Sequence, residues 1–356
     1  MIIWHYVSVN FNIFDFFLYT NMCFFSSKCR EFTGIEAAMN FITRYGIYSA
    51  VAKYLKLKEY VAGIFESDYK CIKEYFRSDS DGVERFENVI DIIVKSNNNV
   101  QRDRAGEAKI SFNGEQIREG HNILVYLRGL IEKKSKAEYP NIAGIQEIIG
   151  QYLYTLQAFY SNTNCIEING VKPYVDLGIK NAQIVDIASP SENTCKNSYR
   201  DQKHLGHCPD NIIEVNKLTS GYKNGQEVTK PQSTSFDKGK CSHGGPNDST
   251  RSTTANCGIN KETSDSVLSP HYDLHEHAAA AAIMATEHFI SGNGTGLINT
   301  FKESLFEKVF GLTKWSAKSL AYAIKVSGSM SNDIAIVKSK TKDIIFTLQN
   351  GPVDYV

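Results

Sequence analysis

The chain has 356 residues, with 39 basic and 39 acidic side chains and a formal net charge of zero. This length predicts about two domains. The composition, 42% hydrophobic and 22% charged, is that of a globular protein and excludes a largely disordered chain. The balanced charge gives no electrostatic reason to expect nucleic acid or an anionic membrane as a partner, and we predict no nucleic-acid binding.

Residues 1–30 are apolar and aromatic without the features of a standard leader. No Lys or Arg precedes Lys28, and Asp15 interrupts the apolar run. A secretory signal has a basic start and an unbroken apolar core, and a membrane span needs about 20 residues with few polar ones. We interpret residues 1–30 as a degenerate signal or an incorrectly assigned start, and we expect no transmembrane segment in the chain.

Apolar residues recur at helical spacing from about Glu36 to Tyr160. The repeat predicts helices over about 83–94, 115–131 and 142–159, and one before them whose apolar face comprises Ile42, Tyr45, Tyr48, Ala52 and Leu55. Four successive amphipathic helices can bury their apolar faces only against one another. The fold class is therefore predicted to be mainly α, a helical bundle.

A long irregular insertion of about 161–270 follows, dominated by Gly, Ser, Thr, Asn, Pro and Lys. Ser269 then suits the N-cap position of a further helix, with Pro270 in its first turn. Five consecutive alanines at 278–282 allow this helix to pack closely on a neighbour. A last short helix is predicted at 301–309, so that the helical domain covers 31–310.

The periodicity changes again near the C-terminus. The apolar run 320–324 suits a buried strand, 327–330 a turn, and 332–344 a helix. A strand, a loop and a helix begin an α/β unit, but one βαβ unit alone takes about 30 residues. Residues 318–356 are too few to complete such a domain, which predicts a truncated domain start or a chain that comes from a partial gene model.

Cys195, Cys208, Cys241 and Cys257 lie in the irregular insertion. Such a segment buries little apolar surface, so crosslinks would stabilise it; buried free thiols are the alternative. The spacings contain no CxxC pair, which argues against a zinc knuckle. We favour disulfides and an oxidising, extracellular compartment. Of the three pairings open to these four cysteines, we prefer Cys195–Cys208 with Cys241–Cys257.

Several short motifs resemble one known family. In chain order, they are Gln157-Ala-Phe-Tyr-Ser161, Leu218-Thr-Ser-Gly-Tyr222, Lys240-Cys-Ser-His-Gly-Gly245, Gly258-Ile-Asn-Lys-Glu262 and Ser269-Pro-His-x-x-Leu-His275. Together they resemble the N-terminal region of the von Willebrand factor A domain-containing protein 7 family, which includes the fungal heterokaryon-incompatibility proteins as relatives. The resemblance covers about 39–356. It implies a bundle like the zinc phospholipase C and nuclease fold, followed by the start of a von Willebrand A domain.

The resemblance also implies a cation loop after the strand at 320–324. In a von Willebrand A domain an Asp-x-Ser-x-Ser loop binds a divalent ion such as Mg²⁺ through oxygen ligands. Ser327 and Ser329 fill the hydroxyl positions here, but Lys325 stands in place of the aspartate. An ammonium group cannot ligate a cation and repels it. We therefore expect a degenerate loop, equivalent to a plain Ser/Gly turn.

The same comparison implies that the zinc ligands of the hydrolase-like bundle have been replaced. Family members carry His or Asp at positions that in this sequence are Met39, Gln101, Ser111, Tyr154, Ala158 and Asn162. The packing residues around each position are retained. Such a pattern is expected of a descendant that has lost its metal, that is, a pseudoenzyme.

His271, His275 and His277 are the main histidine cluster that remains. His271 and His275 are four residues apart and would share one helix face, a spacing that can hold a metal, and His243 is a conceivable third ligand. Helix capping and packing are the alternative role.

The sequence contains no Gly-x-Ser-x-Gly elbow, which would indicate a nucleophilic serine, and no P-loop, which would indicate phosphate binding.

We therefore predict a non-catalytic, secreted module for adhesion or matrix interaction, which binds an extracellular protein or matrix ligand and has no catalytic residues and no required cofactor. The alternative is a zinc-dependent phosphodiesterase or phospholipase-like hydrolase with a rearranged site at His243, His271 and His275. For that alternative zinc, or magnesium, stays open as a cofactor. A nonfunctional gene fragment is the third hypothesis.

Overall fold

The computed structural model describes residues 35–58, 68–184, 186–198 and 207–314. All of these belong to one compact unit, Met1–Trp315. The predictions made for residues 1–30 and for 318–356, including the cation loop with Ser327 and Ser329, lie outside the described residues.

The described chain is mainly helical, as the apolar periodicity predicts. The helices are α2 (Ile35–Lys58), α3 (Asp68–Tyr75), α4 (Gly82–Asp103), α5 (Ile117–Ser135), α6 (Ile142–Asn162), α7 (Cys165–Asn169), α8 (His275–Ser291), α9 (Leu297–Thr300) and α10 (Glu303–Val309). Short 3₁₀ turns occur at Ala108–Ile110, Ser249–Ser252 and Tyr272–Leu274. The strands are β1 (Cys195–Lys196) and β2 (Lys238–Gly239).

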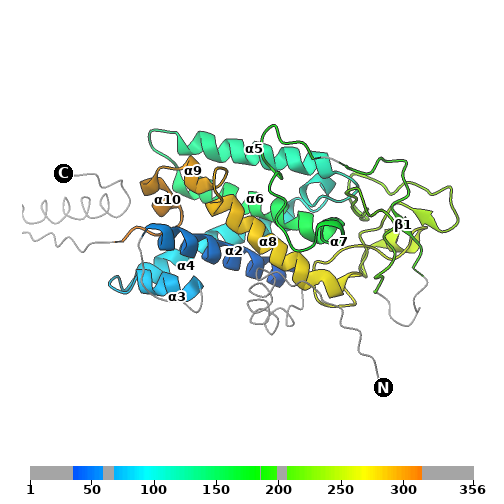
Figure 1. Cartoon of the computed structure of the whole chain (residues 1–356), viewed down its shortest axis with the longest axis horizontal. Coiled ribbons are helices and arrows are strands. Elements are labelled where there is room, and N and C mark those ends of the chain that lie inside the picture. Colours follow the sequence, from blue (N-terminus) through cyan, green and yellow to red (C-terminus); the bar gives the residue numbers. More distant parts are fainter. Residues whose placement is uncertain (1–34, 59–67, 185, 199–206, 315–356) are drawn as a thin grey trace, which may run out of the picture. The chain divides into compact units, whose positions relative to one another are not determined.

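The central helix of the bundle is α6. Its sequence is apolar on nearly every side, and most of its residues are buried, which is typical of a helix surrounded by others. Helices α4, α5 and α8 pack against it, and α2 packs against α8. Figure 1 shows the long helices running side by side, with the irregular segment between α7 and α8 gathered at one end of the bundle.

Two glycines bring pairs of helices unusually close. A Cβ added to Gly46 of α2 would lie 2.5 Å from the Thr286 side chain of α8, and one added to Gly150 of α6 would lie 2.4 Å from the Ile93 carbonyl oxygen of α4. Opposite α2, α8 buries alanines 278, 279, 281, 282 and 285. The predicted close packing of the alanine-rich helix is confirmed.

A buried polar network connects the four helices at the centre. The Asn97 amide of α4 donates to Thr43 Oγ1 of α2 and to Gln157 Oε1 of α6, both at 3.3 Å. The Gln157 amide in turn donates to Thr286 Oγ1 of α8 at 3.1 Å. Buried polar groups are costly without partners. The network gives the polar Asn97 a buried place within α4, which continues to Asp103, beyond the predicted end at Val94.

The helix expected to begin at Ser269 begins later, at His275. The Ser269 hydroxyl accepts a hydrogen bond from the Thr263 backbone N–H at 2.9 Å, so it stabilises the preceding loop. The prediction that Ser269 is the N-cap is therefore wrong. The helix predicted at 301–309 is α10, which begins two residues later, at Glu303, because Phe301 and Lys302 are extended, with φ −89° and ψ 145° at Phe301.

The segment between α7 and α8 is held by two disulfides, Cys195–Cys241 and Cys208–Cys257. Strand β1 pairs antiparallel with β2, placing Cys195 opposite Gly239. The register brings Cys195 within 5.0 Å of Cys241, Cα to Cα. Our preferred pairing, Cys195–Cys208 with Cys241–Cys257, is wrong, because the choice depends on this long-range strand contact. Ala255 and Ile259 pack with Cys195 and Cys241 in a small second core.

None of the helices in the described ranges combines the length and apolar composition needed to span a bilayer.

Candidate functional site

A small cavity lies between the bundle and the irregular segment. Helices α2, α6 and α8 form most of its wall, and residues of the Gly258–Glu262 motif close one side. The space open to the centre of a water molecule is about 20 Å³, room for about one water molecule. Its lining residues are Ile35, Met39, Ile42, Tyr154, Gln157, Ala158, Ser161, Lys261, Glu262, His275, Ala278, Ala279 and Ala282.

Three of the positions at which the resemblance implies lost metal ligands meet in this cavity. Met39 comes from α2, and Tyr154 and Ala158 from successive turns of α6. Two further such positions contact each other nearby, since the Asn162 amide donates to the Ser111 carbonyl oxygen at 3.1 Å. Residues separated by more than a hundred positions in the sequence therefore converge on one location.

His275 is the one imidazole in the cavity lining. Its Nδ1 lies 2.8 Å from the Lys261 carbonyl oxygen, which can only accept, so Nδ1 carries the proton and donates. Burial lowers the pKa of His275, and the ring is neutral at pH 7. Its Nε2 is therefore a bare acceptor, with no hydrogen-bond partner among the described residues.

Glu262 is the one carboxylate in the cavity lining, and it is paired. Its Oε2 lies 3.4 Å from Nε2 of His243. Burial alone would raise the pKa of Glu262, but the Lys223 ammonium, His243 and the Asn162 amide outweigh it and hold that pKa at about 2. The carboxylate is ionised at neutral pH and already engaged by these neighbours.

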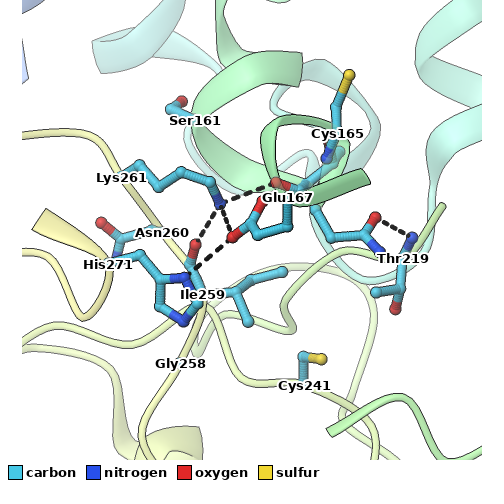
Figure 2. A network of polar contacts seen from close by, with 12 residues as sticks. Ser161, Cys165, Glu167, Thr219, Cys241, Gly258, Ile259, Asn260, Lys261 and His271 are labelled. Atoms are coloured by element: carbon cyan, nitrogen blue, oxygen red, sulfur yellow. Dashed lines mark hydrogen bonds and ion pairs between the residues drawn. The ribbon is translucent and has the colours of Figure 1, made fainter. Parts of the chain in front are cut away.

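The third candidate, His271, belongs to a separate buried network (Figure 2). Its Nδ1 lies 3.0 Å from Glu167 Oε1 of α7, and its Nε2 lies 2.9 Å from Asn211 Oδ1. The fully buried Lys261 Nζ lies 2.9 Å from the same Glu167 oxygen. Lys261 also donates to the carbonyl oxygens of Thr163 and Ile259. Figure 2 shows this ammonium group enclosed by its oxygen partners.

The ion pair keeps Glu167 charged although only 18% of its side chain is exposed. Burial by itself raises a carboxyl pKa, but the Lys261 charge and the His271 hydrogen bond outweigh it, and the pKa of Glu167 is about 2. The network joins α7, the Gly258–Glu262 motif and the loop before α8. Its role is therefore to fix the irregular segment on the bundle.

His243, His271 and His275 lie around the Gly258–Glu262 motif, but each has a different partner. His271 precedes the 3₁₀ turn Tyr272–Leu274 and His275 opens α8, so the prediction that they share one helix face is wrong. His277 is exposed on α8. Within the described ranges, no three His, Cys, Asp or Glu side chains are grouped so that they could hold a metal ion.

The donor set of the cavity does not fit zinc. A zinc site takes three or four nitrogen, sulfur or carboxylate ligands at about 2 Å. Met39 and Ala158 contribute a thioether and a methyl group. Burial and the nearby Glu262 charge raise the pKa of Tyr154, which keeps its phenol neutral. Only His275 Nε2 is left with an unengaged lone pair, and one ligand does not hold a metal.

The Lys261–Glu167 pair was not singled out from the sequence. Lys261 and Glu262 lie in a motif that carries the family resemblance. They are the two charged residues in the otherwise uncharged stretch Gly258–Ser264, and this is the feature of the sequence that could have indicated a buried ion pair. Nothing in the sequence near Glu167 marks it as the partner, because 94 residues separate it from Lys261.

The described chain is a helical bundle with a disulfide-bonded irregular segment beside it, and the cavity between the two lacks a set of three ligands for a metal ion. A family model described as the VWA7 N-terminal domain matches residues 69–293. The chain therefore belongs to the von Willebrand factor A domain-containing protein 7 family, as its motifs indicate.

Relatives of that name occur in mammals. The protein from Mus musculus is 30% identical over 248 residues, which cover 69% of this chain and 26% of the relative. The one from Rattus norvegicus is 31% identical over 208 residues, covering 58% of this chain and 21% of the relative. The matched part is thus about a quarter of the length of these relatives. No solved structure matches the chain.

Proposed function

We propose that the chain is a non-catalytic extracellular module that binds a protein or matrix ligand and uses a hydrolase-like helical scaffold for its shape. The observation that carries this proposal is the cavity, where Met39, Tyr154 and Ala158 occupy positions at which the resemblance implies metal ligands. The implied metal ligands are replaced at all three of these positions, while Thr43 and Gln157 beside them are hydrogen-bonded to each other. This combination favours a chain that keeps the helical scaffold and has lost the metal chemistry.

The extracellular location is supported by the two disulfides. Cys195–Cys241 and Cys208–Cys257 tie together a segment that buries little apolar surface of its own. Stable disulfides form and persist in oxidising compartments. The mammalian relatives carry a von Willebrand A domain in their name, and we propose that residues 318–356 begin such a domain here and that the bundle resembles the zinc phospholipase C fold.

A contact residue for this function is Phe236, whose exposed fraction is 90%. It sits in the loop leading into β2, and this loop is held by hydrogen bonds of its own serines. The Ser233 hydroxyl accepts from the Ser235 N–H at 3.0 Å, and the Ser235 hydroxyl accepts from the Lys238 N–H at 3.3 Å. An exposed aromatic side chain on a hydrogen-bonded loop is of the kind that is enriched at protein interfaces.

Binding of the purified chain to immobilised laminin, fibronectin and collagen tests the adhesion proposal. We expect saturable binding to one of these ligands, weakened about tenfold in the Phe236→Ala variant, as expected for loss of about 1.4 kcal/mol. Tyr139→Ala is the matched control, because Tyr139 is also exposed, at 76%, at the α5–α6 turn. An equal loss of affinity in both variants would show that Phe236 is not the contact residue. Absence of binding to all three ligands would count against the adhesion proposal.

Metal analysis tests the competing hydrolase function. Elemental analysis of the purified chain is expected to find zinc well below one ion per molecule, and phosphodiester hydrolysis at the level of buffer. Zinc near one ion per chain that is lost, together with activity, in His275→Ala would overturn the proposal in favour of the hydrolase.

A further inference from the structure

Two acceptor sequences for N-linked sugars have exposed asparagines. They are Asn247-Asp-Ser249 and Asn293-Gly-Thr295, and both asparagine side chains face solvent. Exposure is not general for the asparagines of this chain, since the following are almost fully buried: Asn97, Asn113, Asn162, Asn164, Asn211 and Asn260. The Asn-x-Ser/Thr sequence marks surface loops of secreted proteins when the asparagine can be reached.

Asn293 lies in a tight turn that ends α8. The turn is closed by a hydrogen bond from the Gly296 N–H to the Gly292 carbonyl oxygen at 2.9 Å. Gly294 adopts a φ of +78°, and no heavy atom lies within 4 Å of a Cβ built there. The backbone beside Asn293 is therefore open to solvent. Within the described residues the structure gives its side-chain amide no hydrogen bond that modification would have to break.

Thr295 anchors the same turn from the other side. Its hydroxyl lies 3.2 Å from Nε2 of His288 in α8. Its carbonyl oxygen accepts a hydrogen bond from Arg128 Nη1 of α5 at 2.5 Å. The turn is held against the bundle through Thr295 while the asparagine points outward. A large group added at Asn293 is thus compatible with the folded chain.

We propose that Asn293 carries an N-linked oligosaccharide. Nδ2 of Asn293 forms a bond to C1 of the first sugar of a polyprenyl-diphosphate-linked oligosaccharide. The C1–oxygen bond to the diphosphate breaks, the diphosphate leaves with the electron pair, and the amide loses one proton. The inference rests on the extracellular part of the proposed function, since this sugar donor is met in the secretory pathway.

The position of the sugar restricts where a ligand can bind. The cavity lies at the first two turns of α8, at His275, Ala278, Ala279 and Ala282, and Asn293 follows its last residue, Ser291. Seventeen helical residues span about 25 Å. The sugar shields the end of the bundle near α9 and leaves the disulfide-bonded end, with Phe236, open for contact.

Peptide mass spectrometry tests the assignment on the full chain expressed in animal cells with its own N-terminus. Medium and cell fractions are digested with and without peptide-N-glycosidase F in heavy-oxygen water, which converts a glycosylated asparagine to labelled aspartate. We expect label at Asn293 that appears only with the glycosidase, since Asn293-Gly294 can also deamidate without it, in the wild type and in Thr295→Ser, which keeps the acceptor sequence and the hydroxyl. Asn293→Gln and Thr295→Val should lose it. Asn247→Gln is the matched control and should retain the label at Asn293.

The outcomes separate this inference from the proposed function. A secreted, disulfide-bonded chain with unlabelled Asn293 overturns the glycosylation alone. A chain found only in the cytosol, with reduced cysteines and no sugar, overturns the extracellular location and the glycosylation together. Label that depends on peptide-N-glycosidase F in the wild type and persists in Thr295→Val would show that modification does not use this acceptor sequence, and would also overturn the assignment.

Discussion

Lys261 is the residue on which the junction between the bundle and the irregular segment depends most directly. Its ammonium group is fully buried and touches a carboxylate and two carbonyl oxygens from different parts of the chain. Desolvating an ammonium group costs several kcal/mol, which only well-placed partners offset. Glu167 needs Lys261 for the same reason, because its pKa of about 2 depends on that charge.

We expect Lys261→Met to destabilise the fold by about 3–5 kcal/mol, because the Glu167 carboxylate, whose side chain is only 18% exposed, loses its buried ionic partner. Urea unfolding at neutral pH measures the change. Lys133→Met, at an exposed position on α5, is the matched control and should alter the free energy of unfolding by about 0.5 kcal/mol or less. A similar small effect for both variants would contradict the structural role of the buried pair.

At the scale of elements, the packing of α8 on α2 decides how close the bundle helices lie. The alanine face of α8 presents little side-chain volume, and Gly46 of α2 lies directly against Thr286. Thr286 is also the last acceptor of the polar network that begins at Asn97. A shift of α8 would therefore disturb both the apolar packing and the buried hydrogen bonds.

Two glycine substitutions test this packing against helix propensity. Gly46→Ala improves intrinsic helix propensity, yet its Cβ would lie 2.5 Å from Thr286, so we expect a net loss of about 1–3 kcal/mol from overpacking. Gly129→Ala on α5, where no atom lies within 4 Å, should instead stabilise by up to about 1 kcal/mol. Thermal unfolding of both variants gives the comparison, and a stabilised Gly46→Ala would show that α2 and α8 are farther apart than described.

For the molecule as a whole, the disulfides constrain the segment with the fewest apolar contacts. They join cysteines 46 and 49 residues apart. In the chain-entropy description, closing a loop of this length contributes about 4 kcal/mol by restricting the unfolded chain. The network around Lys261 then attaches this crosslinked segment to the helices.

Peptide mapping without reduction should recover the linked pairs Cys195–Cys241 and Cys208–Cys257. The replacement of Cys195 and Cys241 by serine should lower the free energy of unfolding by about 2–4 kcal/mol. The Cys71→Ser variant serves as a control for mapping, because Cys71 belongs to neither pair and the same two linked peptides should be recovered. Recovery of Cys195 linked to Cys208 would contradict the strand register between β1 and β2.

The sequence by itself determined the helical class and the family. Apolar periodicity identified α2, α4, α5 and α6, and the alanine run identified the tightly packed helix α8, because these signals act over three or four residues. It missed the last turns of α4, whose polar Asn97 is buried only because Thr43 and Gln157 lie opposite.

Only the tertiary structure decided the disulfide pairing, the Lys261–Glu167 pair and the cavity. Each joins residues far apart in the chain, and local patterns carry no information about which distant partner is chosen. The β1–β2 register selects Cys241 for Cys195, and the packing of α2, α6 and α8 gathers Met39, Ala158 and His275 around one small space. Such contacts form only in the folded chain, because a polar group is buried without a large free-energy cost only where folding places a complementary partner beside it.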